Sequence, residues 1–119
     1  MSNSSFVCYT KLSPCKDSPR DHVIDTITVH CMSKDYTVEA CGELFQDESR
    51  ETSSNYGIGS DGRIALYVDE SDRSWCSSNR DNDHRAITIE VANDGGESTG
   101  WHTVLAITCI LRTPGLWLR

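Results

Sequence analysis

The segment Thr26-Ile27-Thr28-Val29-His30-Cys31 is rich in β-branched residues and predicts a core strand that carries a histidine near its end. A second segment of this kind, Ala86-Ile87-Thr88-Ile89-Glu90-Val91-Ala92-Asn93-Asp94, carries a glutamate. An ordinary buried strand would have an apolar residue at each of these two positions. A histidine and a glutamate near the ends of two core strands suit a metal ligand beside a general base.

The composition is that of one globular domain. The chain has 119 residues, of which 37% are hydrophobic and 24% charged. The formal net charge of -7 argues against nucleic acid as a partner, because phosphate binding needs clustered Lys and Arg. No apolar stretch approaches the roughly 20 residues that a membrane span needs, and the N-terminus has no signal-peptide pattern. We therefore expect a protein that is cytoplasmic as made and has no membrane partner.

The cysteines favour reduced thiols. There are six of them, and none forms a C-x-x-C pair. An even count fits a disulfide framework only in a secreted protein, and no secretion signal is visible. Cys8 and Cys15, which lie close together near the N-terminus, are the best exception.

The remaining elements follow from local patterns. Thr37 is a candidate N-cap for a helix over residues 37–45, where apolar residues recur at helical spacing. Asp61-Gly62 predicts a hairpin turn between strands over residues 55–58 and 64–68. Residues 1–22 and 69–85 are predicted to be irregular. The fold class is therefore α/β, with a mixed central β-sheet of about four strands flanked by helices.

The order of these segments resembles that of the zinc-dependent N-acetylmuramoyl-L-alanine amidases, which include phage lysis enzymes and peptidoglycan-recognition proteins. The resemblance is carried by the histidine strand, by Asn55-Tyr56-Gly57-Ile58-Gly59-Ser60-Asp61-Gly62 and by the glutamate strand, and covers about residues 24–102. It implies an incomplete amidase-type domain. It also implies a hydrolase that uses zinc-activated water to cut the amide bond between N-acetylmuramic acid and the L-alanine of peptidoglycan.

The resemblance assigns roles to two residues. The family's first zinc ligand is a histidine that ends the first core strand, which corresponds to His30, and a glutamate that activates water corresponds to Glu90. Each residue also has a simpler interpretation. A histidine at a strand end is often a hydrogen-bonded structural residue, and a strand glutamate often alternates to the solvent face. With the resemblance added, the ligand and the base are favoured.

Three further residues lie near this predicted site. The loop before the glutamate strand borders the substrate groove in the family, so Trp75 is a candidate contact for sugar or stem peptide, or else a lid over the core. His84 is predicted to be a solvated or carboxylate-paired loop histidine. Some members of the family place a catalytic tyrosine just before the strand over residues 55–58; that position falls on Ser54 here, and Tyr56 lies two residues from it. We therefore predict that Tyr56 is a packed aromatic residue without a catalytic role.

The rest of the family's zinc site is not found in the sequence. Relatives supply the second and third ligands from a C-terminal segment, as a histidine and then a cysteine or aspartate followed by proline. His102 and Cys109 have a suitable separation but lack the following proline and the preceding lysine. We expect that the full Zn²⁺ site is not present and that residues 1–119 form a single partial domain with an atypical apolar tail over residues 103–119. A truncated or frame-shifted amidase would have these features.

The expected function is cell-wall degradation with peptidoglycan as the partner. A phage or prophage endolysin that a holin releases to the cell wall fits a chain without a signal peptide. The alternative is a catalytically inactive peptidoglycan-binding module, or a non-functional fragment that lacks the C-terminal zinc ligands.

Overall fold

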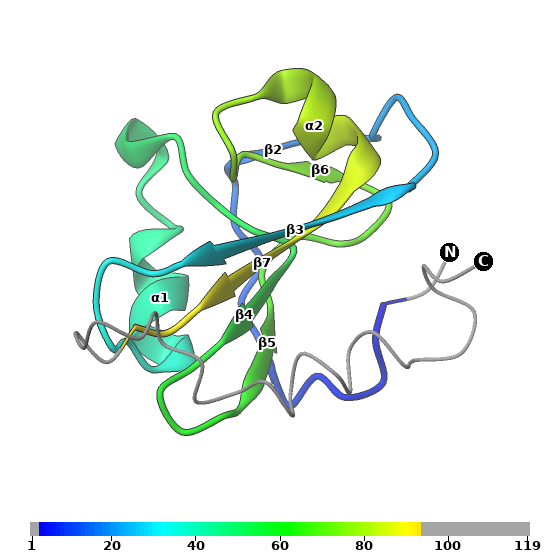
Figure 1. The fold of residues 1–119 in the computed structure, drawn as a ribbon. Coiled ribbons are helices and arrows are strands. Elements are labelled where there is room, and N and C mark those ends of the chain that lie inside the picture. The colour runs from blue at the N-terminus through cyan, green and yellow to red at the C-terminus, as the bar shows by residue number, and fades with distance from the viewer. Residues whose placement is uncertain (1–2, 94–119) are drawn as a thin grey trace.

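Strands β3 (Thr26–Cys31) and β7 (Ala86–Val91) lie side by side and parallel at one edge of a five-stranded mixed sheet (Figure 1). The computed structural model describes residues 3–93, and the sheet order within them is β1-β5-β4-β7-β3. β4 (Tyr56–Ile58) is parallel to β7, and β5 (Ile64–Leu66) is antiparallel to β4. β1 (Tyr9–Thr10) is parallel to β5. The predicted fold class is confirmed, with five strands in place of about four.

Short helices connect these strands. Helix α1 (Val38–Leu44) follows β3, the 3₁₀ helix η1 (Glu48–Arg50) comes next, and α2 (Arg80–Arg85) precedes β7. A separate two-stranded sheet pairs β2 (Lys16–Asp17) with β6 (Arg73–Ser74). Within residues 3–93, the structure contains no helix of the length and apolarity that crossing a membrane requires.

Two predictions of irregular structure were wrong. Residues 1–22 contain β1 and β2, and residues 69–85 contain β6 and α2. Strands of two residues are too short to produce a period-2 pattern. Helix α2 has a polar sequence without an apolar stripe, and its start is fixed by a cap: the Asn79 side chain accepts a hydrogen bond from the Asn82 amide at 3.1 Å.

The predicted first helix is confirmed as α1. Thr37 caps it, because its Oγ1 accepts a hydrogen bond from the Ala40 amide at 3.1 Å. Cys41 is buried on the inner side of the helix. Phe45, which follows the helix, packs edge-on against Tyr67 with ring centroids 5.1 Å apart. These contacts attach α1 to the sheet through the residue that follows β5.

The predicted hairpin between β4 and β5 is also confirmed. Gly62 has a φ of 82°, a conformation that favours glycine, and its amide donates to the Gly59 carbonyl at 2.9 Å. Gly57 meets a different constraint inside β4. A Cβ atom there would lie 2.4 Å from the Tyr67 ring, so the close approach of this ring to the sheet requires glycine.

The core has two parts, one on each face of the sheet. Ile64 and Leu66 belong to one apolar cluster, together with Ile87 and Ile89. Ala65 and Tyr67 alternate with them and belong to the other cluster, which includes the buried side of α1. Each of the short central strands is therefore covered on both faces.

Arg20 is a buried arginine that holds several loops together. Its guanidinium donates hydrogen bonds to the carbonyls of Glu70 at 2.6 Å, Asp72 at 2.8 Å, His84 at 2.8 Å and Ala86 at 3.1 Å. These carbonyls belong to the segment before β6 and to the junction of α2 with β7. One side chain therefore fixes both ends of the region between β6 and β7.

We expect Arg20→Lys to lower the free energy of unfolding by at least about 3 kcal/mol. A lysine ammonium cannot reproduce the planar array of donors, and several buried carbonyls would lose their partners. Urea denaturation followed by tryptophan fluorescence measures this change. Arg85→Lys is the matched control, because Arg85 is exposed and pairs with Asp25 at the surface; it should leave the midpoint almost unchanged. Equal midpoints for both variants would contradict the structural role of Arg20.

Candidate active site

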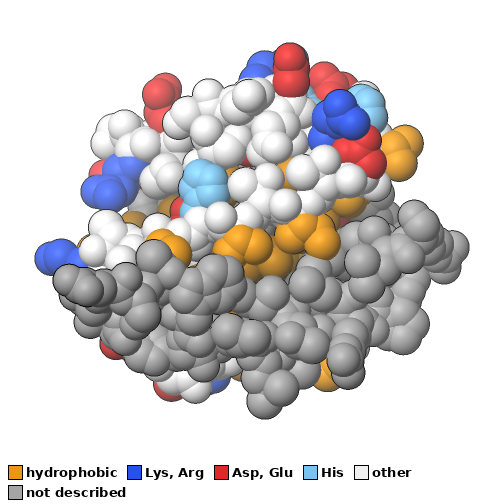
Figure 2. Space-filling model, viewed as in Figure 1, with side chains coloured by type: hydrophobic (Ala, Val, Ile, Leu, Met, Phe, Trp, Pro, Cys, Tyr) orange, Lys and Arg blue, Asp and Glu red, His pale blue; other side chains and the backbone are white. Residues whose placement is uncertain are grey.

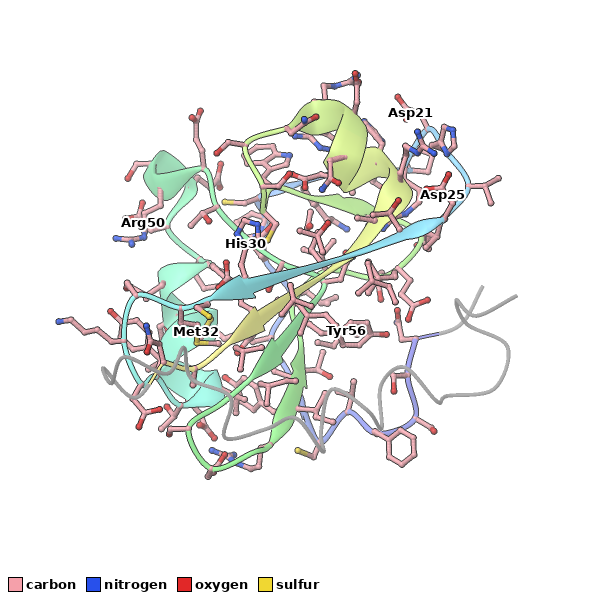
Figure 3. All side chains as sticks on the ribbon, viewed as in Figure 1. Asp21, Asp25, His30, Met32, Arg50 and Tyr56 are labelled. Atoms are coloured by element: carbon pink, nitrogen blue, oxygen red, sulfur yellow. The ribbon has the colours of Figure 1, made fainter. Side chains whose placement is uncertain are left out.

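The parallel register of β3 and β7 places His30 directly beside Glu90. The two side chains lie on the face opposite to Ile87 and Ile89, which are buried in an apolar cluster. The His30 Nδ1 atom lies 3.9 Å from Glu90 Oε1. Figure 3 shows His30 near the arrowhead of β3, the end that points toward α1. The two residues singled out in the sequence therefore meet at the carboxyl ends of two parallel strands.

Cys76 joins this pair from the loop after β6. Its Sγ atom lies 3.8 Å from Glu90 Oε1. The buried carboxylate of Asp83 holds this loop by accepting hydrogen bonds from the amides of Cys76 at 3.0 Å and Ser77 at 3.1 Å. Cys76 was not predicted as a site residue. It has no ligand-type spacing in the sequence, and its approach to Glu90 depends on how the loop folds.

His30, Cys76 and Glu90 together form a group of possible metal donors. The imidazole nitrogen, thiol sulfur and carboxylate oxygen all lie within 4.8 Å of one another, and all three residues are partly buried. Among residues 3–93, this is the one grouping of three or more such side chains with this spacing. Donors of these three kinds bind Zn²⁺ in proteins. The structure therefore contains a possible metal site, which we name the donor group.

Burial governs the electrostatics of the donor group. It raises the pKa of the Glu90 carboxyl, and the nearby His30 and a hydrogen bond from the Cys76 thiol offset part of the rise. Burial also raises the pKa of the Cys76 thiol, as do the charges of Glu90 and Asp83. In the absence of a bound cation, the Cys76 thiol therefore stays protonated. Its S–H group donates a hydrogen bond to Glu90.

A buried network of hydrogen bonds lies next to the donor group, on the face of β7 that carries Glu90. Thr88 lies on the same face of β7 as Glu90, and its Oγ1 is 2.6 Å from the Ser74 Oγ. The Asn55 amide donates to Thr88 Oγ1 at 2.9 Å, and the Thr88 amide donates to Asn55 Oδ1 at 3.1 Å. These bonds connect β6 and the start of β4 to β7. The elements that present Cys76 and Glu90 are therefore joined by satisfied polar contacts.

Two hollows flank the donor group. The larger is an open cleft of about 620 Å³, and Cys76, Trp75 and several arginines contribute to its lining. The smaller, of about 140 Å³, has Glu90 in its lining together with apolar side chains. Arg50 lines both hollows. The two hollows therefore share a wall at Arg50, with Cys76 in the lining of one and Glu90 in the lining of the other.

Charged side chains are distributed unevenly on this face of the molecule. Figure 2 shows a dense group of both signs near the start of β3, where Figure 3 labels Asp21 and Asp25. The other end of β3, which carries His30, has fewer charged side chains on the face shown. The donor group therefore lies apart from this surface charge cluster.

The two aromatic residues considered in the sequence, Trp75 and Tyr56, differ in their exposure. Trp75 is half-buried at the cleft, and its Nε1 donates to Asp17 Oδ1 at 3.3 Å. This position is compatible with a contact to a bound molecule. Tyr56 is fully buried, and its hydroxyl donates to the buried Glu70. The prediction that Tyr56 is a packed aromatic residue is confirmed.

His84 departs in part from its prediction. It lies in α2 and is buried, so the prediction of a solvated loop histidine was wrong. The expected carboxylate partner is present, since Asp21 Oδ1 lies 3.0 Å from His84 Nδ1. The same nitrogen accepts a hydrogen bond from the Asp21 amide at 3.0 Å. The pattern of hydrophobic residues did not predict that His84 is buried, because it lies in α2, a helix with a polar sequence.

The remaining sequence predictions concern thiols and the C-terminal segment. Cys8 and Cys15 do not form the disulfide considered above, since both are unoxidised thiols in the structure. His102, Cys109 and the tail over residues 103–119 lie outside the described residues. The predicted domain limits remain untested.

The fold and the donor group define an α/β protein with a possible metal site at the carboxyl ends of its parallel strands. The chain belongs to the N-acetylmuramoyl-L-alanine amidase family, whose family model matches residues 20–108. No curated protein sequence matches the chain significantly.

Two solved structures share the fold. The first is a mutant endolysin from Bacillus subtilis, with a TM-score of 0.55 and 18% identity over 72% of this chain and 60% of that chain. The second is a selenomethionine derivative of AmpD, with a TM-score of 0.64 and 19% identity over 90% of this chain and 70% of that chain. At these identities the likeness establishes the fold, and the chain spans less than two thirds of the endolysin.

The surroundings of His84 predict a pH-dependent stability. Burial lowers its pKa below the ordinary value of 6.5; Arg80 and Arg73 act in the same direction, whereas Asp21 and Asp17 oppose them. The folded state favours the neutral ring, so the unfolded chain binds more protons below about pH 6.5. The contribution is therefore fully present above this pH and is lost as the pH falls through the folded-state pKa. We expect His84→Asn to flatten the dependence of unfolding free energy on pH below about pH 6.5.

Urea denaturation at a series of pH values tests the His84 prediction. Asparagine retains an acceptor for the Asp21 amide but does not titrate. His22→Asn is the control, because His22 is exposed, and it should leave the slope as in the wild type. A wild-type slope in His84→Asn would show that another group causes the acid destabilisation.

Proposed function

We propose that this protein is a peptidoglycan hydrolase that cleaves the amide bond between N-acetylmuramic acid and the L-alanine of the stem peptide. Its membership of the amidase family supports peptidoglycan amidase activity in general. The fold shared with an endolysin is consistent with action on the cell wall. The observation that carries the residue assignment is the in-register pairing of His30 with Glu90.

The described residues fit a zinc ion. Zinc binds imidazole nitrogen, thiolate sulfur and carboxylate oxygen, and the donor group brings one of each within 4.8 Å. The three residues are partly buried, and Cys76 lies in the wall of the open cleft, through which a substrate approaches in this proposal. In the proposed site, His30 holds the ion through its imidazole.

Glu90 performs the proton transfers in this proposal. A bound zinc ion acts as a Lewis acid, which lowers the pKa of water from 15.7 toward roughly 7. The Glu90 carboxylate accepts a proton from the attacking water while the oxygen of this water bonds to the amide carbon. The same carboxyl then donates this proton to the alanine nitrogen as the carbon–nitrogen bond breaks, so that the stem peptide leaves as an amine.

The cleft of about 620 Å³ is the proposed substrate groove. It begins at Cys76, beside Glu90, and its other lining residues include Trp75 and several arginines. An aromatic ring can contact the apolar face of a sugar, and arginines suit the carboxylates of a peptide. The groove therefore offers contacts to both parts of the substrate on either side of the amide bond.

We expect Glu90→Gln to reduce hydrolysis by about 10²–10⁴-fold, because the amide keeps the size of the side chain but cannot accept the proton. Bound zinc should be unchanged, because Glu90 acts in this proposal as the base and not as a ligand. Release of stem peptide from a soluble muropeptide measures the activity, and atomic absorption measures the metal. Glu43→Gln, at an exposed position in α1, is the matched control and should retain wild-type activity.

The outcomes of the Glu90 experiment separate the proposals. Activity near the wild type in Glu90→Gln would assign the base to another residue. A zinc-loaded wild-type protein that binds peptidoglycan but releases no peptide would support the non-catalytic binding module and contradict the hydrolase.

We expect Trp75→Ala to raise KM roughly tenfold with little change in kcat, as loss of an aromatic contact worth about 1.4 kcal/mol would do. Trp75→Phe keeps an aromatic face and should recover most of the affinity. Thermal unfolding of both variants provides the comparison with a purely structural role. A lower melting temperature with an unchanged KM would show that Trp75 is a lid over the core.

A further inference from the structure

We propose that Cys76 is a metal ligand that acts together with His30, while Glu90 remains free to act on water. The inference rests on the proposed metal site and adds a residue to it. The family resemblance places no ligand in this loop, and the sequence offers only His30 in a ligand position. The structure, in contrast, brings a thiol from a separate loop to the same strand ends.

The distances support a shared ion. Cys76 Sγ and His30 Nδ1 lie 3.8 Å and 3.9 Å from the same Glu90 oxygen, and the donor atoms are within 4.8 Å of one another. Two ligand atoms on one tetrahedral zinc, with bonds of about 2.0–2.3 Å, are about 3.4–3.6 Å apart. Closing the remaining gap of about 1 Å needs only a small rotation of the side chains.

The backbone of Cys76 is fixed in a way that suits a ligand. Its amide donates to the Asp83 carboxylate, and the next residue, Ser77, donates to the same carboxylate through its amide and its hydroxyl. Asp83 is itself fully buried in α2. The thiol is therefore held over the strand ends by a support outside the donor group, as is common for metal ligands.

Binding of zinc at Cys76 requires loss of the thiol proton. Zinc binds the thiolate, so each ion that binds at Cys76 releases one proton to solvent. The cation then compensates the negative charge of the thiolate beside Glu90. Sulfur is the softest of the three donors and suits zinc, whereas use of Glu90 as a ligand would remove the base from the proposed reaction.

Cobalt(II) substitution tests the ligand directly. Cobalt replaces zinc in tetrahedral sites, and a thiolate ligand gives it an intense charge-transfer band in the near ultraviolet that imidazole and carboxylate ligands do not give. Cobalt(II) added to the metal-free chain of residues 1–119 should produce this band. The band should disappear in Cys76→Ser and persist in Glu90→Gln. Cys31→Ser is the matched control, because Cys31 follows His30 in β3, and it should keep the band.

Each alternative outcome contradicts a defined part of the proposal. A band that survives in Cys76→Ser, or that is lost in Cys31→Ser alone, would overturn the assignment to Cys76. Cobalt binding that depends on His30 but gives no band would also overturn it, while leaving the proposed function intact. Absence of cobalt binding to the wild type would remove the metal site on which both proposals rest.

A measurement on the unmodified protein covers the case in which Cys76→Ser does not fold. Alkylation of each thiol by iodoacetamide can be followed by mass spectrometry with and without zinc. Zinc should slow the modification of Cys76 about tenfold or more, because a metal-bound thiolate is not free to react, and should leave the exposed Cys8 unaffected. Equal rates at Cys76 with and without zinc would overturn the proposal.

Discussion

The parallel register of β3 with β7 is the constraint on which the donor group depends. The strands pair residue by residue from Thr26 with Ala86 to Cys31 with Val91, and this register sets His30 opposite Glu90. A slip of one residue would turn one of the two side chains to the other face of the sheet. The burial of Ile87 and Ile89 in the core opposes such a slip. The apolar side of the strand thus determines the face on which His30 and Glu90 lie.

The loop that carries Cys76 is fixed by a second set of contacts, independent of the strand register. Arg20 donates to the carbonyl of His84, which closes α2, and the Asp83 side chain in the same helix holds the amide of Cys76. The backbone of α2 is therefore held by the guanidinium of Arg20, and the Asp83 side chain of α2 is held by the loop that carries Cys76. A change at Arg20 would loosen the position of Cys76 without touching His30, so the stability of the α2 region and the geometry of the site are physically connected.

The parts of the structure that the sequence predicts are those with a local cause. β-branched runs predicted β3 and β7, Thr37 predicted the start of α1, and Asp61-Gly62 predicted the hairpin turn. The two-residue strands have no such pattern, because each is held by pairing with a strand distant in the sequence. Helix α2 has none either, because the Asn79 cap and a contact from Arg20 stabilise it. Likewise, His30 and Glu90 lie in strands that the runs of β-branched residues predicted. The approach of Cys76 to them depends on tertiary contacts of a loop, which no spacing encodes.

The face of β7 that carries Glu90 is polar in the interior of the protein as well as at the donor group. A strand whose outer face presents Glu90 cannot bury only apolar groups on that face, and Thr88 and Asn55 fill the space with polar atoms that satisfy one another. Burial nevertheless raises the pKa of both acidic members of the donor group. Two negative charges side by side would be costly in this environment, so the Cys76 thiol stays protonated beside Glu90. The hydrogen bond from the neutral Cys76 thiol to Glu90 therefore belongs, with the contacts of Thr88 and Asn55, to the polar support on this face of the sheet.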